Sequence, residues 1–537
     1  MMTMGRSRAG VMGLCAALVC GATSAAAFCA EESAAESAFR FHVDPVVLRP
    51  LFVEVDTGSS KFEEYRDMDS GMTVPLLRFF GESGDGNREF EFTAENISRA
   101  DERYTMIYRN SGNMRILLDY NVIPHRFGND AVLLFSNSDP RSMRISDAIQ
   151  QSLQSAIATQ FGISPAGVNY AFLNGLLDPL LSTAQSIDLG LERKRAHARI
   201  EIHKLRPWSM AVDLRQETRQ GNRPYGGSFG FSNIVEIPEP IDFRTSSADV
   251  SGEWKGKRSG VGFGVRVSKF DNLIKSVTYD NPFRITDSTG ANAYTAPGAS
   301  SIDGAVFGRN ALAPDNLAGD VYVNGRARFG DSGWLNGSAR YGLMSQDDRL
   351  LAYTTNTSIN PTTDPNIPFV TTDRSNLPVR NADADVRITN VAVSGGSKLG
   401  SRVAWQGRYR YYDYDNQSSE IMFPGYVRFD AVWEPIPRVT VPYAWTRQQG
   451  GLEVGWDIVR STHVAVSWDR ETWDRDFREI EESEEDVYKV SVNHRQDRFS
   501  IRGSLEHGNR TTSDYDVEAQ ELTFVSPAST AVCNSRS

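Results

Sequence analysis

The sequence has few cysteines, few histidines and only one long apolar run. Four Cys and seven His occur among 537 residues, and neither CxxC nor CxxCH is present. Covalent haem attachment and a zinc ribbon are therefore excluded for this chain. A mean hydropathy of −0.40 excludes a bundle of membrane-spanning helices, which needs repeated apolar runs. Acidic residues outnumber basic ones, 68 to 57, so the basic footprint of a non-specific nucleic-acid binder is missing.

The single apolar run lies at the start of the chain and predicts a secretory signal peptide. Arg6 and Arg8 precede the apolar core, and small residues follow it. We expect cleavage after Ala27 or Ala30, so that residues 1–27 form a leader. The mature protein is then exported, but its cysteine content does not provide a disulfide framework.

Strict alternation of apolar and polar residues is the strongest signal in the rest of the chain. Residues 321–329 and 335–343 alternate in this way on both sides of Gly330-Asp331-Ser332-Gly333. This pattern predicts a hairpin whose arms of about nine residues are long enough to cross a bilayer when tilted. Residues 401–412, 488–493 and 499–506 repeat the alternation. Soluble antiparallel sheets also alternate, so a second criterion is needed.

The lengths of the connections provide that criterion. Tight turns are predicted near residues 83–87, 110–113, 204–207, 255–260, 330–333, 395–400, 457–461 and 495–498. Longer polar loops alternate with them, near residues 57–71, 121–190, 219–246, 271–318, 344–383, 413–450 and 469–486, and a short one near 97–102. Short turns on one side and long loops on the other are typical of bacterial outer-membrane barrels. The sequence therefore predicts an all-β, transmembrane, antiparallel up-and-down β-barrel of about 18 strands, located in the outer membrane.

This interpretation divides the mature chain into three parts. Residues 28–50 form a periplasmic N-terminal segment, residues 51–525 form the barrel, and residues 526–537 form an atypical tail, so we expect a shortened C-terminus. The first strand is expected near Leu51–Asp56, which places the tight turns in the periplasm. Helix-like spacing over Ile145–Leu181 predicts short helices inside the loop 121–190, with a partial plug or an external cap as alternatives. A girdle of aromatic rings is expected beside the tight turns, formed by Trp208, Trp254, Phe329, Trp456 and Phe499.

Four short motifs resemble functional sites, but none of them predicts a catalytic, cofactor-binding or metal-binding residue. Gly330-Asp331-Ser332-Gly333 resembles a serine protease motif but is placed at a hairpin tip without a nearby His. The alternating glycines Gly260, Gly262 and Gly264 suit a closely packed strand. A lumenal polar row explains His197, Arg199, Glu201 and His203 without a metal, and the acidic run over residues 479–486 suits a solvated external loop.

Arginines dominate the positions that the alternation places inside the barrel. A net-acidic chain with such a lumen is expected to have segregated its charges. The lumen then favours anionic solutes, or it binds a protein with acidic groups, because a guanidinium pairs bidentately with a carboxylate. A generic water-filled lumen is the third interpretation. The arginines predicted to face a partner are Arg199, Arg326, Arg328, Arg340, Arg402, Arg408, Arg410 and Arg502, and Arg115 and Arg266 share their face.

Several loop sequences resemble landmarks of the MtrB/PioB family of outer-membrane barrels. They occur in family order between about residue 45 and residue 525, and they are Lys61-Phe62-Glu63-Glu64-Tyr65, Ile123-Pro124-His125-Arg126-Phe127, Ile237-Pro238-Glu239-Pro240-Ile241-Asp242, Asp280-Asn281-Pro282-Phe283 and Ala313-Pro314-Asp315-Asn316. Two features depart from the family: a CxxC near the mature N-terminus is absent, and so is a closing strand with an aromatic end.

The resemblance implies a porin–cytochrome conduit. In that family the barrel sheathes a periplasmic multihaem c-type cytochrome and often meets a second multihaem cytochrome on the cell surface, so that electrons cross the outer membrane. The haem is carried by the partner, and this chain is expected to bind no cofactor itself. The alternatives are a diffusion porin that favours anions and, third, an outer-membrane hydrolase.

Overall fold

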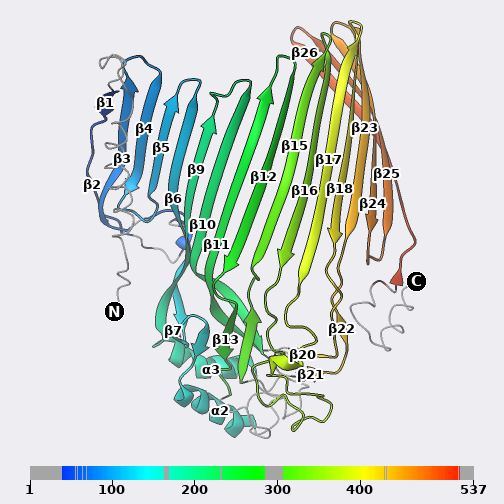
Figure 1. Cartoon of the computed structure of the whole chain (residues 1–537). Helices are drawn as coiled ribbons and strands as arrows, with labels where there is room; N and C mark the ends of the chain where they lie inside the picture. The colour runs from blue at the N-terminus through cyan, green and yellow to red at the C-terminus, as the bar shows by residue number, and fades with distance from the viewer. Residues whose placement is uncertain are drawn as a thin grey trace.

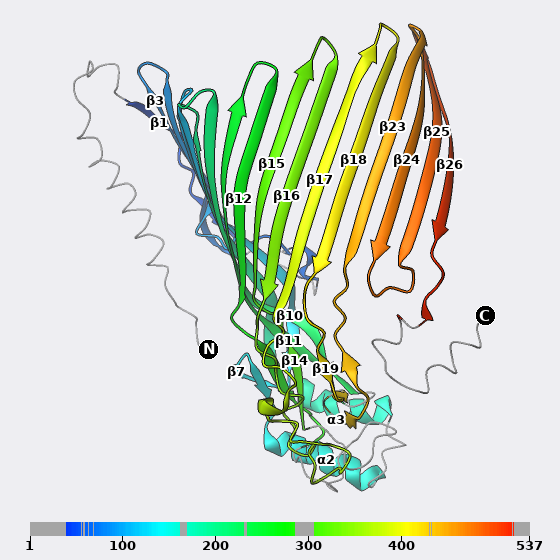
Figure 2. The same ribbon diagram turned by 45° about the vertical axis from the view of Figure 1, so that its right-hand side comes forward.

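The computed structural model describes residues 39–517 and 519, apart from residues 55, 57, 58, 63, 68, 162–168, 230–232, 285–305, 429 and 431. The expected signal peptide and the tail 526–537 therefore lie outside the described residues. Most of the described chain belongs to one 18-stranded antiparallel sheet. The strands run side by side and the sheet curls, so that one face is convex and the other concave (Figures 1 and 2).

Sixteen long strands follow one another in up-and-down order, each paired with the next. They are β3 (Gly71–Ser83), β4 (Arg88–Ile97), β5 (Arg103–Asn110), β6 (Met114–Leu133), β9 (Gln185–Ile202), β10 (Trp208–Phe229), β11 (Asn233–Lys255), β12 (Ser259–Asn272), β15 (Asn316–Phe329), β16 (Gly333–Gln346), β17 (Ala384–Leu399), β18 (Val403–Asn416), β23 (Trp445–Val459), β24 (Thr462–Arg475), β25 (Glu482–Gln496) and β26 (Phe499–Thr512). Two short strands, β1 (Phe39–Val43) and β2 (Arg49–Leu51), both pair with β3. The predicted fold class is thus confirmed.

The predicted first strand near Leu51–Asp56 is wrong. Leu51 ends β2, and pairing along β3 already begins at Phe39. Aromatic contacts explain the choice, because the Phe41 ring stacks on Phe79 of β3 with centroids 5.0 Å apart. Phe52, in contrast, is 92% exposed, so the apolar residues after β2 gain no burial that would hold a strand.

All eight predicted tight turns join neighbouring long strands at one end of the sheet, the upper end in Figure 1. The turn between β15 and β16 requires φ = +56° at Gly330, and the turn between β17 and β18 requires φ = +74° at Gly400. Glycine adopts this left-handed conformation without the cost that a Cβ would add. The expected aromatic residues lie beside these turns, and Trp208 pairs directly with Trp254 across the β10–β11 ladder.

The long connections lie at the opposite end, but several of them are shorter than predicted. Strand β6 continues to Leu133 and β9 starts at Gln185, so the loop 121–190 is partly strand. The expected loop 219–246 is almost entirely strand, because β10 and β11 stay paired as far as Phe229 and Asn233. Likewise β25 already begins at Glu482, inside the acidic run. The extension of β10 over residues 219–229 is mostly polar or glycine, and apolar alternation detects only the part of a strand that faces lipid.

The long connections fold into a cap beyond the strand ends (Figure 2). Helices α2 (Asp147–Phe161) and α3 (Tyr170–Leu181) confirm the helical prediction and pack on each other through Leu153, Ile157 and neighbouring apolar residues. A small sheet accompanies them, formed by β7 (Ser136–Asp139), β8 (Ser142–Arg144), β13 (Ser276–Asp280) and β14 (Phe307–Ala311). The remaining short elements are β19 (Met422–Phe423), β20 (Tyr426–Arg428), β21 (Val432–Glu434), β22 (Arg438–Val439), η2 (Ser60–Phe62) and η3 (Arg374–Asn376). The helices thus lie beyond the strand ends (Figure 2), and the external position of this cap stays a prediction.

The cap has its own buried core. Tyr279 and Val277 of β13 are fully buried against Ile237 of β11. Asp430 lies in a cap loop and accepts hydrogen bonds from the Arg309 backbone N–H (2.8 Å) and the Thr354 hydroxyl (3.1 Å). Burial raises the pKa of Asp430, and these hydrogen bonds offset part of the effect.

The loop sequences that carry the family resemblance gather where the strands meet the cap. Glu239 is 3% exposed and accepts two N–H bonds from Arg223 of the neighbouring strand, at 2.6 and 3.0 Å. Asp280 accepts hydrogen bonds from Arg144 and from the Ile145 backbone, both at 2.7 Å. These landmark residues therefore build the joint between sheet and cap.

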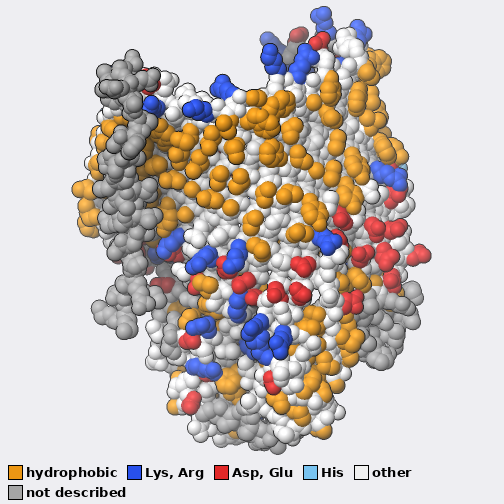
Figure 3. Space-filling model, viewed as in Figure 1, with side chains coloured by type: hydrophobic (Ala, Val, Ile, Leu, Met, Phe, Trp, Pro, Cys, Tyr) orange, Lys and Arg blue, Asp and Glu red, His pale blue; other side chains and the backbone are white. Residues whose placement is uncertain are grey.

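The convex face of the sheet is apolar. Val265, Val321 and Leu343 are each more than half exposed, and side chains of this kind form a broad band below the tight-turn edge (Figure 3). Lys, Arg, Asp and Glu side chains on this face concentrate toward the long connections. No helix in the described residues is long and apolar enough to span a bilayer. A wide apolar band on strands is the surface that a bilayer covers.

Candidate functional site

The concave face of the sheet is polar and forms a hollow of about 950 Å³, lined by strands from β11 to β26. Alternation along each strand places an apolar residue outside and a polar or small residue inside. On β15, Tyr322, Asn324 and Arg326 lie inside, while Val321 and Val323 are exposed outside. We therefore take this inner face as the candidate functional surface.

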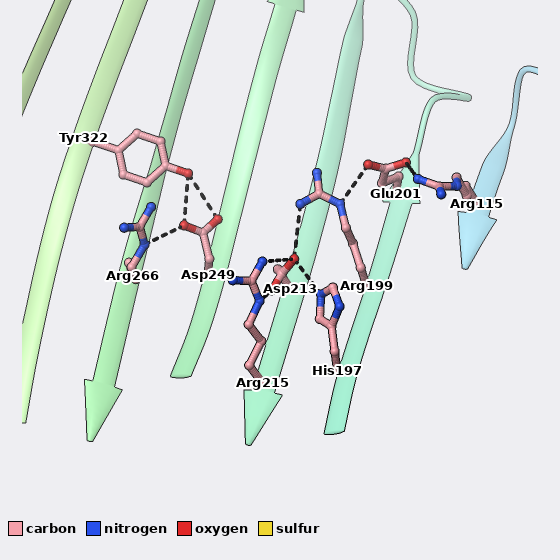
Figure 4. Close-up of polar contacts among 9 residues, drawn as sticks. All are labelled: Arg115, His197, Arg199, Glu201, Asp213, Arg215, Asp249, Arg266 and Tyr322. Carbon is pink, nitrogen blue, oxygen red and sulfur yellow. Dashed lines mark hydrogen bonds and ion pairs between the residues drawn. The ribbon is translucent and has the colours of Figure 1, made fainter. Parts of the chain in front are cut away.

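Two clusters of ion pairs and hydrogen bonds lie on neighbouring strands of the inner face, one around Asp213 and one around Asp249 (Figure 4). The Arg199 guanidinium of β9 contacts Glu201 on its own strand at 2.8 Å and Asp213 on β10 at 3.2 Å. Asp213 also contacts the His197 ring at 3.0 Å and Arg215 at 2.8 Å. The Asp213 side chain is buried. Three basic side chains on two strands, Arg199, His197 and Arg215, share its carboxylate.

A second cluster on the inner face, centred on Asp249, depends on a glycine. Tyr322 of β15 donates to both carboxylate oxygens of Asp249, at 3.1 Å each, although β12 lies between β15 and β11. The Tyr322 ring crosses β12 over Gly264, where a Cβ atom would lie 2.5 Å from the ring. Arg266 contacts the same carboxylate at 3.3 Å. The alternating glycines of β12 therefore belong to a closely packed strand, as predicted.

Further along the inner face, two more predicted arginines are paired with carboxylates. Arg340 of β16 contacts Asp320 at 2.8 Å, and Arg408 of β18 contacts Asp469 at 2.7 Å. Arg326 lies 3.9 Å from Glu253, at the outer limit of an ion pair. Arg410 donates to the Asn390 side chain at 3.4 Å.

Three predicted arginines lie elsewhere, close to the tight turns. Arg328 is the next-to-last residue of β15, Arg402 immediately precedes β18, and Arg502 lies near the start of β26. All three are exposed. The described part of the chain offers their guanidinium groups no carboxylate partner within 4 Å.

The expected segregation of charge is wrong. Carboxylates share the inner face with the arginines, among them Asp213, Asp249, Asp320 and Asp469, which were not among the predicted site residues. Each of them falls on the polar side of its own alternating strand, so the same rule that selected the arginines would have found them. Single-strand patterns do not reveal which partner lies opposite, because that depends on the pairing register.

The weaker motifs have structural roles. The Ser332 hydroxyl lies in a hairpin tip, 3.3 Å from the Ser397 hydroxyl, and accepts a hydrogen bond from the Lys398 backbone. Glu484 and Asp486 of the acidic run lie on strand β25 and contact Arg470 on β24. Within the described ranges, no three His, Cys, Asp or Glu side chains are grouped closely enough to hold a metal ion.

An up-and-down antiparallel sheet with an apolar convex face, a polar concave face and connections sorted by length defines an outer-membrane β-barrel protein. The family model of the outer membrane beta-barrel porins MtrB/PioB matches residues 54–530. The chain belongs to this family, and its place is the bacterial outer membrane.

One curated relative and two solved structures illustrate the similarity. The outer membrane protein MtrB of Shewanella baltica (strain OS185) is 24% identical over 344 residues, which cover 63% of this chain and 44% of that protein. The match thus spans less than half of the relative's length. The ferric-catecholate import receptor Fiu of E. coli K12 in its open form has a TM-score of 0.36 and 10% identity, over 82% of this chain and 62% of that one. The siderophore receptor PiuA of Acinetobacter baumannii has a TM-score of 0.36 and 11% identity, over 84% and 63%. TM-scores and sequence identities this low indicate nothing about function.

Proposed function

We propose that this barrel sheathes and positions a periplasmic multihaem c-type cytochrome, so that electrons cross the outer membrane through the partner's haems. Membership of the MtrB/PioB family over residues 54–530 is the observation that carries the proposal. The chain acts as a non-enzymatic sheath and binds no haem itself. A second multihaem cytochrome at the cell surface, on the side of the cap, completes the conduit.

The two faces of the sheet differ in polarity, and this difference supports the proposal. Lipid cannot host a polar cytochrome, because each polar group without a hydrogen bond costs about 2–7 kcal/mol there, and an unpaired charge costs far more. A wall with an apolar outside and a polar inside separates the two. Most inner-face arginines near the middle of the wall are already paired with carboxylates of the same sheet, for example Arg340 with Asp320. This pairing favours a sheath over a pore that selects anions.

A diffusion porin is the second candidate, supported by the polar hollow. The test is purification of the barrel from its native membrane, followed by absorbance spectroscopy and single-channel recording. A sheath predicts haem absorbance that co-migrates with this chain, together with low ion conductance. A haem-free barrel with large, steady currents would overturn the proposal and support the porin.

A further inference from the structure

Arginines line part of the tight-turn end of the sheet, from β11 to β26. We define the mouth arginines as Arg258, Arg328, Arg402, Arg460, Arg498 and Arg502. They lie in or beside five successive tight turns, from the β11–β12 turn to the β25–β26 turn. All six are exposed, and basic side chains are visible along the upper edge of Figure 3.

The mouth arginines differ from the arginines farther along the wall in their partners. Arg199, Arg340 and Arg408 each contact a carboxylate. No ion pair within the described residues involves a mouth arginine. The acidic residues of the same turns do not neutralise them, since Asp457 contacts His463 at 2.8 Å, and Asp331 and Asp497 contact no basic side chain among the described residues.

Two of the mouth turns also enclose a hollow. A space of about 460 Å³ opens between the β23–β24 and β25–β26 turns, and its lining includes Arg460, Arg498 and Arg502. Arg502 shares the side of β26 that carries Glu506, which contacts Lys489 on the inner face. Alternation gives Arg328 and Arg402 the same inward side as Arg326 and Arg408. These side chains therefore lie on the inner side of the sheet. A protein that enters the barrel from the tight-turn end would contact them, whereas lipid surrounds the outer side.

We propose that the mouth arginines form a docking surface for an acidic face of the partner protein that enters the barrel from the tight-turn end. This inference rests on the proposed function and gives it a location. Planar guanidinium groups without internal partners pair with carboxylates in a bidentate way. A row of arginines that spans five of the eight tight turns matches an extended acidic surface rather than a single small anion. Such complementary charges accelerate association and set orientation.

The direct test uses fluorescently labelled poly-L-glutamate as an acidic probe and the folded full chain in detergent. The test variant carries Arg402→Glu, Arg498→Glu and Arg502→Glu. The matched control carries Arg349→Glu, Arg374→Glu and Arg380→Glu, three exposed arginines on the long-connection side that change the net charge equally. We expect the test variant to bind the probe at least about tenfold more weakly, with a smaller salt dependence, and the control to bind like wild type. Equal binding by both variants would overturn the inference.

A second arm separates this inference from the proposed function. Each barrel is purified from its native membrane, and the haem retained per barrel is measured. Loss of haem from the test variant alone supports docking at the mouth. Full haem retention by the test variant overturns the inference but leaves the sheath standing. A wild-type barrel that binds the probe at the mouth but retains no haem overturns the sheath. Binding of phosphatidylglycerol vesicles that depends on the mouth arginines, with probe binding unchanged, would reassign the surface to lipid and overturn the inference.

Discussion

Asp213 is a carboxylate that three basic side chains of the inner face share. It lies directly opposite Asp249 in the β10–β11 ladder, an arrangement that repels unless cations intervene. Arg199, Arg215 and His197 supply that compensation on one side, and Arg266 and Tyr322 supply it for Asp249. The two acidic residues are therefore tolerated because each of them has its own basic partners.

Replacing Asp213 with Ala should destabilise the folded barrel. Two guanidinium groups and an imidazole then lose their shared acceptor, and a loss of about 1–3 kcal/mol is expected for charged partners left without a hydrogen bond. The measurement is the temperature at which the heat-modifiable folded band disappears on a gel. Asp331→Ala, in an exposed turn, is the control and should behave like wild type. An Asp213→Ala barrel as heat-resistant as this control would contradict the role assigned to the network.

Strand β12 lies between Tyr322 and Asp249. Its Gly264 leaves the space in which the Tyr322 ring crosses the strand and reaches that carboxylate. Gly264→Ala places a methyl group 2.5 Å from the Tyr322 ring and should cost about 1–3 kcal/mol through overpacking. Gly325→Ala is the matched control on neighbouring β15, since its Cβ would meet its nearest atom at 3.8 Å. Adding Tyr322→Ala to Gly264→Ala should cost less than the two separate losses combined, because the clash disappears. Additive losses in urea-unfolding measurements would rule out this packing explanation.

The strands also show which features of the fold can be predicted from sequence patterns. The tight turns and the alternating middles of the strands were predictable, because lipid on one side and water on the other impose period two. The extensions of β10 and β11 beyond the apolar band were not predictable in this way, since both of their faces are partly polar. The arginines were found, but not their partners: Arg199 meets Asp213 only through the β9–β10 register, and one sequence without its partner strands does not reveal that register.

For the whole molecule, the sorted connections predict its orientation in the membrane. The long-connection side, with the cap, should face the outside, and the tight turns should face the periplasm. Single cysteines at Asn366, in the connection between β16 and β17, and at Asp331, in the β15–β16 turn, test this in a background with the other cysteines replaced by serine. Both positions are exposed. Only the Asn366→Cys protein should be labelled on intact cells by a membrane-impermeant maleimide, and both should be labelled after the outer membrane is permeabilised. Labelling of Asp331→Cys alone on intact cells would reverse the orientation.

The paired charges of the wall have one more consequence, which concerns the electric field within the barrel. Neighbouring cations and anions, such as Arg340 and Asp320 at 2.8 Å, act as small dipoles, and the field of a dipole falls off more steeply with distance than the field of a net charge. Salt screens what is left over a length of about 8 Å. A charged group that travels along the barrel axis should therefore meet a nearly flat potential beside the middle of the wall and a positive one at the mouth. In a barrel that holds a row of redox centres, such a wall would shift the reduction potentials of the centres in its middle very little and would leave them to be set by the protein that carries them.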